Sequence, residues 1–209
     1  MLNKTKLMNY VGQIRIYSLV DLILLLIAVK ADTFQFLGII FLWLGFLLFL
    51  EAGHKHSYRL QFPKYSWLFL YLLGLFFYHA IGAFLFILFS YLYTQKNKLS
   101  LGLVSPAFRI IQTIVLLSGV IGFSGYFIWL AAILVGFRNF LGDIRDVDKD
   151  KKEGKKTIPV LLKMPTIKYI HLYGCWLTSI VWWSYTDLNF FWLILVLFIQ
   201  RLTCNWTTR

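Results

Sequence analysis

Charged residues are scarce in this chain of 209 residues. Only 14% of the residues are charged, whereas 59% are hydrophobic. A single soluble core cannot absorb so much apolar surface, so the composition excludes an ordinary globular domain in water. We expect one transmembrane domain over residues 1–209, with no soluble domain beside it.

Cysteines and a signal-peptide cleavage site are also lacking. The two cysteines, Cys175 and Cys204, both lie in apolar runs, so neither a disulfide framework nor a cysteine-based metal site is supported. Both are expected to be packing residues. Lys4, Lys6 and Arg15 precede the first apolar run, but no small-residue cleavage site follows it. This run is therefore expected to be a retained helix.

Apolar runs recur along the whole sequence. Most of them are near the roughly 20 residues that a helix needs to cross the hydrocarbon core of a bilayer. They cover residues 14–31, 34–50, 63–94, 106–121, 123–141, 166–185 and 188–204. The pattern predicts an all-α fold, a polytopic helical bundle in the membrane.

The third run, residues 63–94, is long for one helix and short for two. Basic residues can decide between the two possibilities, because short cytoplasmic loops collect Lys and Arg. If the run turns within residues 78–82, all of the 21 basic residues except Lys30 fall on one side. One long helix would divide them between the two sides. We therefore predict about eight transmembrane helices around a central cavity, with both termini cytoplasmic.

Two functional classes are disfavoured by what the helices and loops lack. The formal charge of +12 follows from the topology, since the basic side faces the anionic headgroups of membrane lipids. No soluble basic module exists, so nucleic acid is not an expected partner. Polar residues are few in the helices, which disfavours a transporter or a channel. The sequence indicates no protein partner.

Asp21 and His79 are ionisable residues inside the apolar runs. Such groups are costly within a membrane and are often functional. Asp21 is near the cytoplasmic end of its run, and His79 lies at the opposite turn. Both are therefore expected to reach water.

The most charged stretch, residues 143–156, follows the sixth predicted helix and falls on the cytoplasmic side. If the helix continues, Asp143, Asp146 and Asp150 line one face, because they are spaced three and four apart, and Asp148 points away. Three carboxylates on one face repel one another unless a positive charge lies between them. Mg²⁺ prefers oxygen ligands and is commonly held by one or two carboxylates together with a substrate phosphate.

Lysines follow these aspartates directly, at positions 151, 152, 155 and 156. Their ammonium groups are suited to hold further phosphate oxygens. Carboxylates, Mg²⁺ and lysines together indicate a diphosphate ligand. The alternative is a solvated loop of mixed charge whose lysines only follow the positive-inside rule, and spacing alone leaves both open.

One set of residues in this stretch has a recognisable pattern, namely Asp143, Asp146 and Asp150, followed by Gly154, Thr157 and Pro159. The pattern resembles the second aspartate-rich motif of the UbiA family of intramembrane prenyltransferases. Nine helices are usual in that family, with this motif after the sixth, as here. The resemblance runs from the first predicted helix through the eighth, and no counterpart of the family's last helix is expected in this sequence.

This resemblance implies that Mg²⁺ bridges Asp143, Asp146 and Asp150 to the diphosphate of a prenyl donor. Lys155 and Lys156 are expected to contact the same diphosphate. The carbon–oxygen bond of the donor ionises, and an acceptor captures the allylic cation. A metal ion offsets the charge of the departing diphosphate, and the aromatic residues, 19% of the chain, can stabilise a carbocation.

The family's first motif, an Asn and two Asp at intervals of four, is altered. At the end of the second helix this chain has Glu51, Lys55 and Arg59 at the same interval. By the same resemblance, Glu51 is expected to remain as a metal ligand. Lys55 and Arg59 either bind the diphosphate directly in place of a metal ion, or mark a site that has lost the ions needed to ionise the donor.

The stretch after the fourth predicted helix resembles the family's Tyr-x-x-x-Lys segment near the diphosphate, with Tyr93 three positions before Lys96. The function implied is transfer of an isoprenoid chain from a prenyl diphosphate to an aromatic or other lipid-soluble acceptor. Quinone precursors, porphyrins and glycerol phosphates all remain open as acceptors. The alternative is a non-catalytic membrane protein of the same fold that binds isoprenoid lipid.

Overall fold

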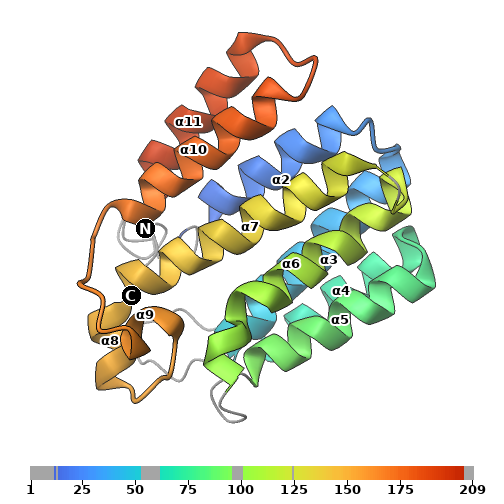
Figure 1. Cartoon of the computed structure of the whole chain (residues 1–209). Coiled ribbons are helices and arrows are strands. Elements are labelled where there is room, and N and C mark those ends of the chain that lie inside the picture. Colours follow the sequence, from blue (N-terminus) through green and yellow to red (C-terminus); the bar gives the residue numbers. More distant parts are fainter. Residues whose placement is uncertain (1–11, 13, 53–61, 96–100, 124, 205–209) are drawn as a thin grey trace, which may run out of the picture. The chain divides into compact units, whose positions relative to one another are not determined.

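The structure is a computed structural model that describes residues 12, 14–52, 62–95, 101–123 and 125–204. All regular secondary structure in these residues is helical (Figure 1). The prediction of an all-α fold is confirmed. The helices are α2 (Ile16–Ala28), α3 (Thr33–Ala52), α4 (Ser66–Phe77), α5 (Ala80–Thr94), the 3₁₀ helix η1 (Leu101–Val104), α6 (Ser105–Ile121), α7 (Tyr126–Arg145), α8 (Val147–Lys152), α9 (Ile158–Leu161), α10 (Ile170–Ser184) and α11 (Phe190–Thr203).

Three helical stretches in the described residues are long and apolar enough to cross a membrane. They are α3, α7 and the stretch Gly102–Ile121, which joins η1 to α6. Helices α2, α4, α5 and α11 are apolar but shorter. The chain is therefore compatible with a membrane protein, and the eight-pass topology stays a prediction.

The long third run of the sequence is broken as predicted. Helix α4 ends at Phe77, Tyr78 is extended with φ −115° and ψ 159°, and α5 begins at Ala80. The backbone N–H of Gly82 donates to Nδ1 of His79 over 3.0 Å, which caps the first turn of α5. His79 lies at the surface of the structure, and its contact with water stays a prediction.

The chain divides into two compact units. Unit 1 contains α2, α3, α4 and α11, together with the start of α5 up to Ala83 and the end of α10 from Ser179. Unit 2 contains the remainder of α5, η1, α6 to α9, and α10 up to Thr178. The expectation of a single domain stays a prediction.

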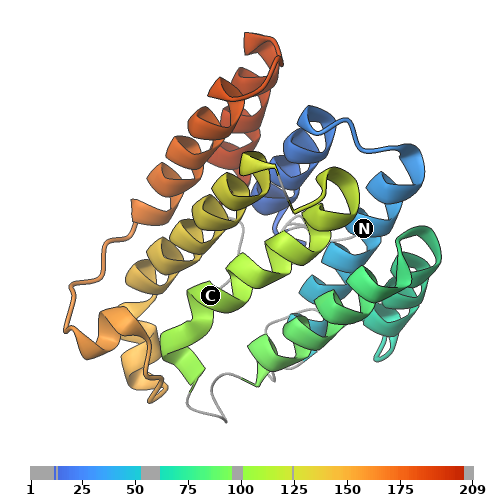
Figure 2. The same ribbon diagram turned by 45° about the vertical axis from the view of Figure 1, so that its right-hand side comes forward.

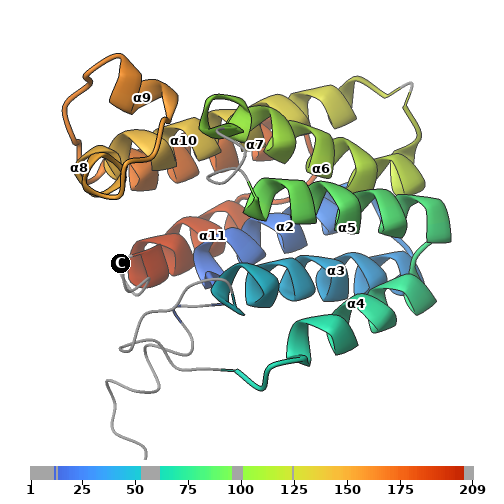
Figure 3. The same ribbon diagram turned by 90° about the horizontal axis from the view of Figure 1, so that it is seen from below.

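Within unit 1, α3 and α4 pack closely along their length (Figure 3). Glycines make the approach possible. A Cβ on Gly38 would lie 2.8 Å from the backbone nitrogen of Tyr78, and one on Gly74 would lie 2.6 Å from Leu42. Small residues at helix contacts let backbones approach in membrane proteins, where burial of apolar surface gives little driving force.

A buried polar cluster joins three helices of unit 1. Oδ1 of Asp21, in α2, accepts hydrogen bonds from Oγ of Ser179 over 2.7 Å and from Nε2 of Gln200 over 3.0 Å. Gln200 also donates to Ser179 over 2.9 Å. Asp21 is only 7% exposed, so the expectation that it reaches water is wrong. Donors from α10 and α11 take the place of water at this carboxylate.

Within unit 2, α6 and α7 lie side by side (Figure 2). Gly136 of α7 faces α6, where a Cβ would lie 2.5 Å from Cγ1 of Ile110. Gly174 of α10 is packed just as closely against Leu141 of α7. These contacts hold the C-terminal half of α7, from which the aspartate-rich segment continues.

Candidate functional site

The three predicted metal-binding aspartates lie at the end of α7 and in α8. Asp143 is in the last turn of α7, Asp146 stands between the two helices, and Asp150 is in α8. Asp143 and Asp146 are half-buried, and Asp150 is only 6% exposed. Asp148 is exposed, as expected for a residue on the opposite face.

The helix does not run unbroken through these residues. It is interrupted at Asp146, whose φ of −98° and ψ of 9° lie outside the α-helical range. Two backbone bonds span the break, from Asp146 N to Gly142 O over 3.1 Å and from Asp150 N to Asp146 O over 2.8 Å. The spacing of the three carboxylates therefore remains close to helical, although the axis changes.

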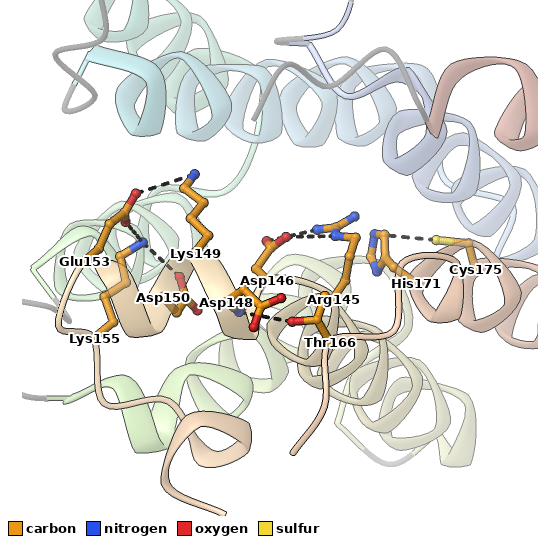
Figure 4. Close-up of polar contacts among 10 residues, drawn as sticks. All are labelled: Arg145, Asp146, Asp148, Lys149, Asp150, Glu153, Lys155, Thr166, His171 and Cys175. Carbon is orange, nitrogen blue, oxygen red and sulfur yellow. Dashed lines mark hydrogen bonds and ion pairs between the residues drawn. The ribbon is translucent and has the colours of Figure 1, made fainter. Parts of the chain in front are cut away.

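Arg145 pairs with Asp146 in a two-point contact (Figure 4). Its Nε and Nη2 donate to the two carboxylate oxygens over 3.0 and 3.2 Å. Such forked pairs are the stronger kind of charge-assisted hydrogen bond. A base that is adjacent in sequence thus compensates one of the three carboxylates.

Lys155 pairs with two acids, Asp150 and Glu153. Its Nζ lies 3.1 Å from Oδ1 of Asp150 and 2.6 Å from Oε2 of Glu153. Burial lowers the pKa of Lys155, but the hydrogen bonds and charges of Glu153 and Asp150 outweigh it, so the pKa lies above its usual 10.5. Lys155 is therefore a firmly protonated partner of a buried carboxylate.

The turn that brings Lys155 back to Asp150 depends on Gly154. Helix α8 ends with Gly154 at φ +67°, the left-handed conformation that glycine adopts without a steric penalty. Gly154 N donates to Lys151 O over 3.2 Å, and Lys155 N donates to Asp150 O over 2.9 Å. This pair of bonds is a Schellman motif. Gly154, one of the residues that carries the family resemblance, therefore has a local structural role.

The donor chemistry of the segment suits Mg²⁺, since it offers hard carboxylate oxygens. Among the described residues, however, no three His, Cys, Asp or Glu side chains converge into a group that could hold a metal ion alone. Mg²⁺ in proteins commonly keeps one or two carboxylates and takes its other ligands from water or substrate phosphates. The donor chemistry of the segment therefore suits Mg²⁺, but Asp143, Asp146 and Asp150 do not converge on one ion position.

The altered first motif lies partly outside the described residues. Lys55 and Arg59 are not among them, and Lys96 is also outside. Glu51, in the last turn of α3, lies 3.8 Å from Nη2 of Arg15, and its side chain is largely buried. In unit 1, a base therefore faces the one remaining acid of the motif.

Tyr93 lies on α5 in a network with α6 and α7. Its hydroxyl donates to Oδ1 of Asn139 over 3.1 Å, and Nδ2 of Asn139 donates to Oγ of Ser105 over 3.1 Å. The guanidinium of Arg109 lies over the Tyr93 ring, 5.8 Å from its centre. The predicted diphosphate contact Tyr93 thus reaches α7 at Asn139, one turn before Asp143.

Arg109 continues this network deeper into unit 2. It donates from Nη1 to Oε1 of Gln112 over 2.5 Å, and Gln112 donates to Oγ of Ser90 over 2.9 Å. All three are buried. Sequence analysis did not select these residues, although a spacing of three between Arg109 and Gln112 on an apolar helix is a readable sign of a buried polar face.

A second set of polar contacts joins α7 to α10. Arg138 is buried and donates from Nε to Oγ1 of Thr178 over 3.1 Å. His171 lies near Gly142, and its Nε2 is 3.8 Å from Sγ of Cys175. His171, Cys175 and Thr178 are spaced four and three apart, so they lie on one face of α10. The sequence alone did not single out this face.

Among the predicted site residues of unit 2, the structure brings Lys155 to Asp150, whereas Asp143, Asp146 and Asp150 lie near one another along the chain without converging on one point. Lys156 is exposed, and its backbone packs against η1 at Gly102. Comparison of the chain with protein-family models, with curated proteins and with solved structures finds no match.

Proposed function

We propose that the chain is a Mg²⁺-dependent prenyltransferase of the UbiA type. It would transfer an isoprenoid chain from a prenyl diphosphate to an aromatic or other lipid-soluble acceptor in the membrane. The observation that carries the proposal is the placement of three carboxylates where the apolar helix α7 passes into α8, with Asp150 buried and Asp143 and Asp146 half-buried. Carboxylates grouped in this way, with lysines close by in sequence, suit a cation that also binds phosphate.

The residues of the segment have distinct proposed roles. Asp143, Asp146 and Asp150 would hold Mg²⁺, which offsets the negative charge of the leaving diphosphate. Lys155 is already positively charged beside Asp150, where it can also donate to a diphosphate oxygen. Tyr93 would fix α5 to α7 through Asn139. Lys156, Lys55, Arg59 and Lys96 remain proposed diphosphate contacts.

A second candidate is a non-catalytic membrane protein that binds isoprenoid lipid. The ion pairs Arg145–Asp146 and Lys155–Asp150 favour it, because a self-compensated segment is stable without metal. Under this alternative the carboxylates serve the local fold alone. The two candidates therefore differ in whether Mg²⁺ and a prenyl diphosphate engage Asp146.

The test is to incubate purified protein with labelled farnesyl and geranylgeranyl diphosphate, Mg²⁺ and acceptors of the three open classes. Asp146→Ala removes a proposed ligand. Asp148→Ala is its matched control, since Asp148 is an exposed aspartate of the same segment. We expect release of diphosphate from the wild type and from Asp148→Ala, and loss of release in Asp146→Ala. Equal release from all three proteins, or none from any, would sink the proposal.

A further inference from the structure

The connection from α8 to α10 leaves large apolar side chains uncovered. In residues 161–169 every residue except Met164 is exposed. Leu161 is 50% exposed and Leu162 is 68% exposed. Both leucines lie outside the three stretches that are long and apolar enough to cross a membrane, so a place within a transmembrane helix does not explain their exposure. Exposed apolar side chains gathered at one place mark a site of interaction.

Lysines accompany these leucines. Residues 148–169 contain seven lysines and three acids, and two of the acids, Asp150 and Glu153, are paired with Lys155. No acid follows Glu153 in the sequence before Asp187. Five lysines of this part of the chain are exposed, namely Lys151, Lys152, Lys156, Lys163 and Lys168. The connection therefore presents a positive surface that also carries apolar side chains.

The exposed leucines stand on a hydrogen-bonded turn of unit 2, beyond the C-terminal end of α7 (Figure 1). Helix α9 packs against α7 and α8. It ends in a Schellman motif, in which Met164 N donates to Pro159 O over 2.9 Å and Lys163 N donates to Val160 O over 3.2 Å. We call residues 161–163, which this turn presents, the α9 tip.

We propose that the α9 tip inserts into the headgroup region of a bilayer, and that the exposed lysines around it in sequence bind anionic phospholipid headgroups. Insertion removes the leucine side chains from water. The lysines can lay their hydrocarbon stems along the apolar layer while their ammonium groups reach the phosphates. Each lysine near an anionic surface strengthens such binding about fivefold. The inference goes beyond prenyl transfer and does not depend on it.

Position and composition favour a lipid over a soluble anion or a protein. Helix α7 is one of the candidate membrane spans, and where it crosses a bilayer its C-terminal end places α8 and α9 at the headgroups. A soluble phosphate would engage the lysines but leave the leucines in water. Tyr169 is also exposed, with Nζ of Lys168 5.5 Å from the centre of its ring, and tyrosine is enriched at membrane interfaces.

Lys163→Gly removes a charge of the α9 tip without harm to the turn. Lys163 has φ +52°, the left-handed conformation in which glycine is favoured, so the variant should unfold at a higher temperature than wild type in detergent alone. Added phosphatidylglycerol should raise the unfolding temperature of wild type more than that of the variant. The apparent affinity for phosphatidylglycerol, from titration of this shift, should fall about fivefold. Phosphatidylcholine should act equally on both.

Lys30→Gly is the matched control. Lys30 is exposed, has φ +54° and closes α2 with the same kind of turn, in which its N–H donates to Ile27 O over 3.1 Å and Ala31 N donates to Leu26 O over 3.0 Å. It is the only basic residue in the sequence between Arg15 and Lys55. The control should gain stability in the same way and keep the wild-type response to phosphatidylglycerol. An equal response in wild type and Lys163→Gly, or an equal loss in both variants, would overturn the proposal.

Insertion of the α9 tip is tested with a fluorescent label on Leu162→Cys in nanodiscs, which leave both faces of the bilayer open. Cys175 and Cys204 are buried, so the introduced cysteine takes the label. With equal amounts of phosphatidylcholine and phosphatidylserine, a nitroxide on the lipid should quench the label and aqueous iodide should not. With phosphatidylcholine alone, iodide should gain access.

Two results would remove the lipid as the occupant. A label that iodide reaches equally in both kinds of nanodisc would overturn insertion and leave the α9 tip open to water or to a protein. Stabilisation by inorganic diphosphate as large as that by phosphatidylglycerol, and equally weakened in Lys163→Gly, would assign the lysines to a soluble anion. Neither result bears on diphosphate release from a prenyl donor, so prenyl transfer is tested separately.

Discussion

Basic side chains that are close in sequence pair with two of the three predicted metal-binding aspartates. Arg145 bonds Asp146, and Lys155 bonds Asp150. The sequence predicted three carboxylates on one face, and the structure pairs two of them with neighbouring basic side chains. Spacing could identify the face and the exposure of Asp148, because both follow from helical periodicity. It could not identify the pairs, since these depend on rotamers and on the turn at Gly154.

The raised pKa of Lys155 makes stability depend on alkaline pH. The pKa in the folded state lies above 10.5, so this contribution is present at lower pH and is lost as the pH rises through the folded value. In thermal unfolding of purified protein, wild type should lose more stability above pH 10.5 than Lys155→Gln does. The exposed Lys151→Gln is the control. Parallel pH profiles for wild type and Lys155→Gln would contradict the coupling.

The carboxylate of Asp21 depends on donors from two other helices. Ser179→Ala removes one of them from a fully buried position, and a buried acceptor that loses its donor costs about 1–3 kcal/mol. Ser184→Ala, at an exposed serine of the same helix, should be near neutral. Equal unfolding midpoints for both variants would show that the Asp21 cluster does not stabilise unit 1.

Helices α3 and α4 pack against each other with their backbones in close approach. The break at Tyr78 and His79 was readable from the basic residues of the loops and from the length of the run. The glycine contacts could not be predicted, because a sequence does not show which surface Gly38 and Gly74 will face. Likewise, the polar faces of α6, α7 and α10 lie within runs that read as almost wholly apolar.

Gly38→Ala should disrupt the α3–α4 contact. Its Cβ would meet the backbone nitrogen of Tyr78 at 2.8 Å, and overpacking of this kind costs about 1–3 kcal/mol. Gly142→Ala is the matched control, since its Cβ meets only ordinary contacts. We expect a lower unfolding temperature for Gly38→Ala alone. A drop of similar size in both variants would point to a general effect of replacing helical glycine.

All regular secondary structure in the described part of the chain is helical, and three stretches there are long and apolar enough to cross a membrane. The predicted topology extends this to eight passes with the aspartate-rich segment on the cytoplasmic side. It rests on the distribution of Lys and Arg, which is a property of the loops and not of the helix contacts. Helix lengths alone cannot decide it, since α2, α4, α5 and α11 are shorter than a full span.

Single cysteines at exposed positions test this topology. Asp148→Cys and Lys30→Cys should react with a membrane-impermeant maleimide from opposite sides of sealed vesicles. Cys175 and Cys204 are buried, so the unmodified chain is the background control. Reaction of both introduced cysteines from the same side would contradict the hairpin topology.

The central claim is that Asp146 serves a Mg²⁺-dependent reaction of a prenyl diphosphate. The most direct measurement is release of inorganic diphosphate from geranylgeranyl diphosphate by purified protein with an acceptor, with and without Mg²⁺, for wild type, Asp146→Ala and Asp148→Ala. We predict Mg²⁺-dependent release by wild type and Asp148→Ala, and loss of that release in Asp146→Ala. Release that is independent of Mg²⁺, or that is unchanged in Asp146→Ala, would contradict the claim.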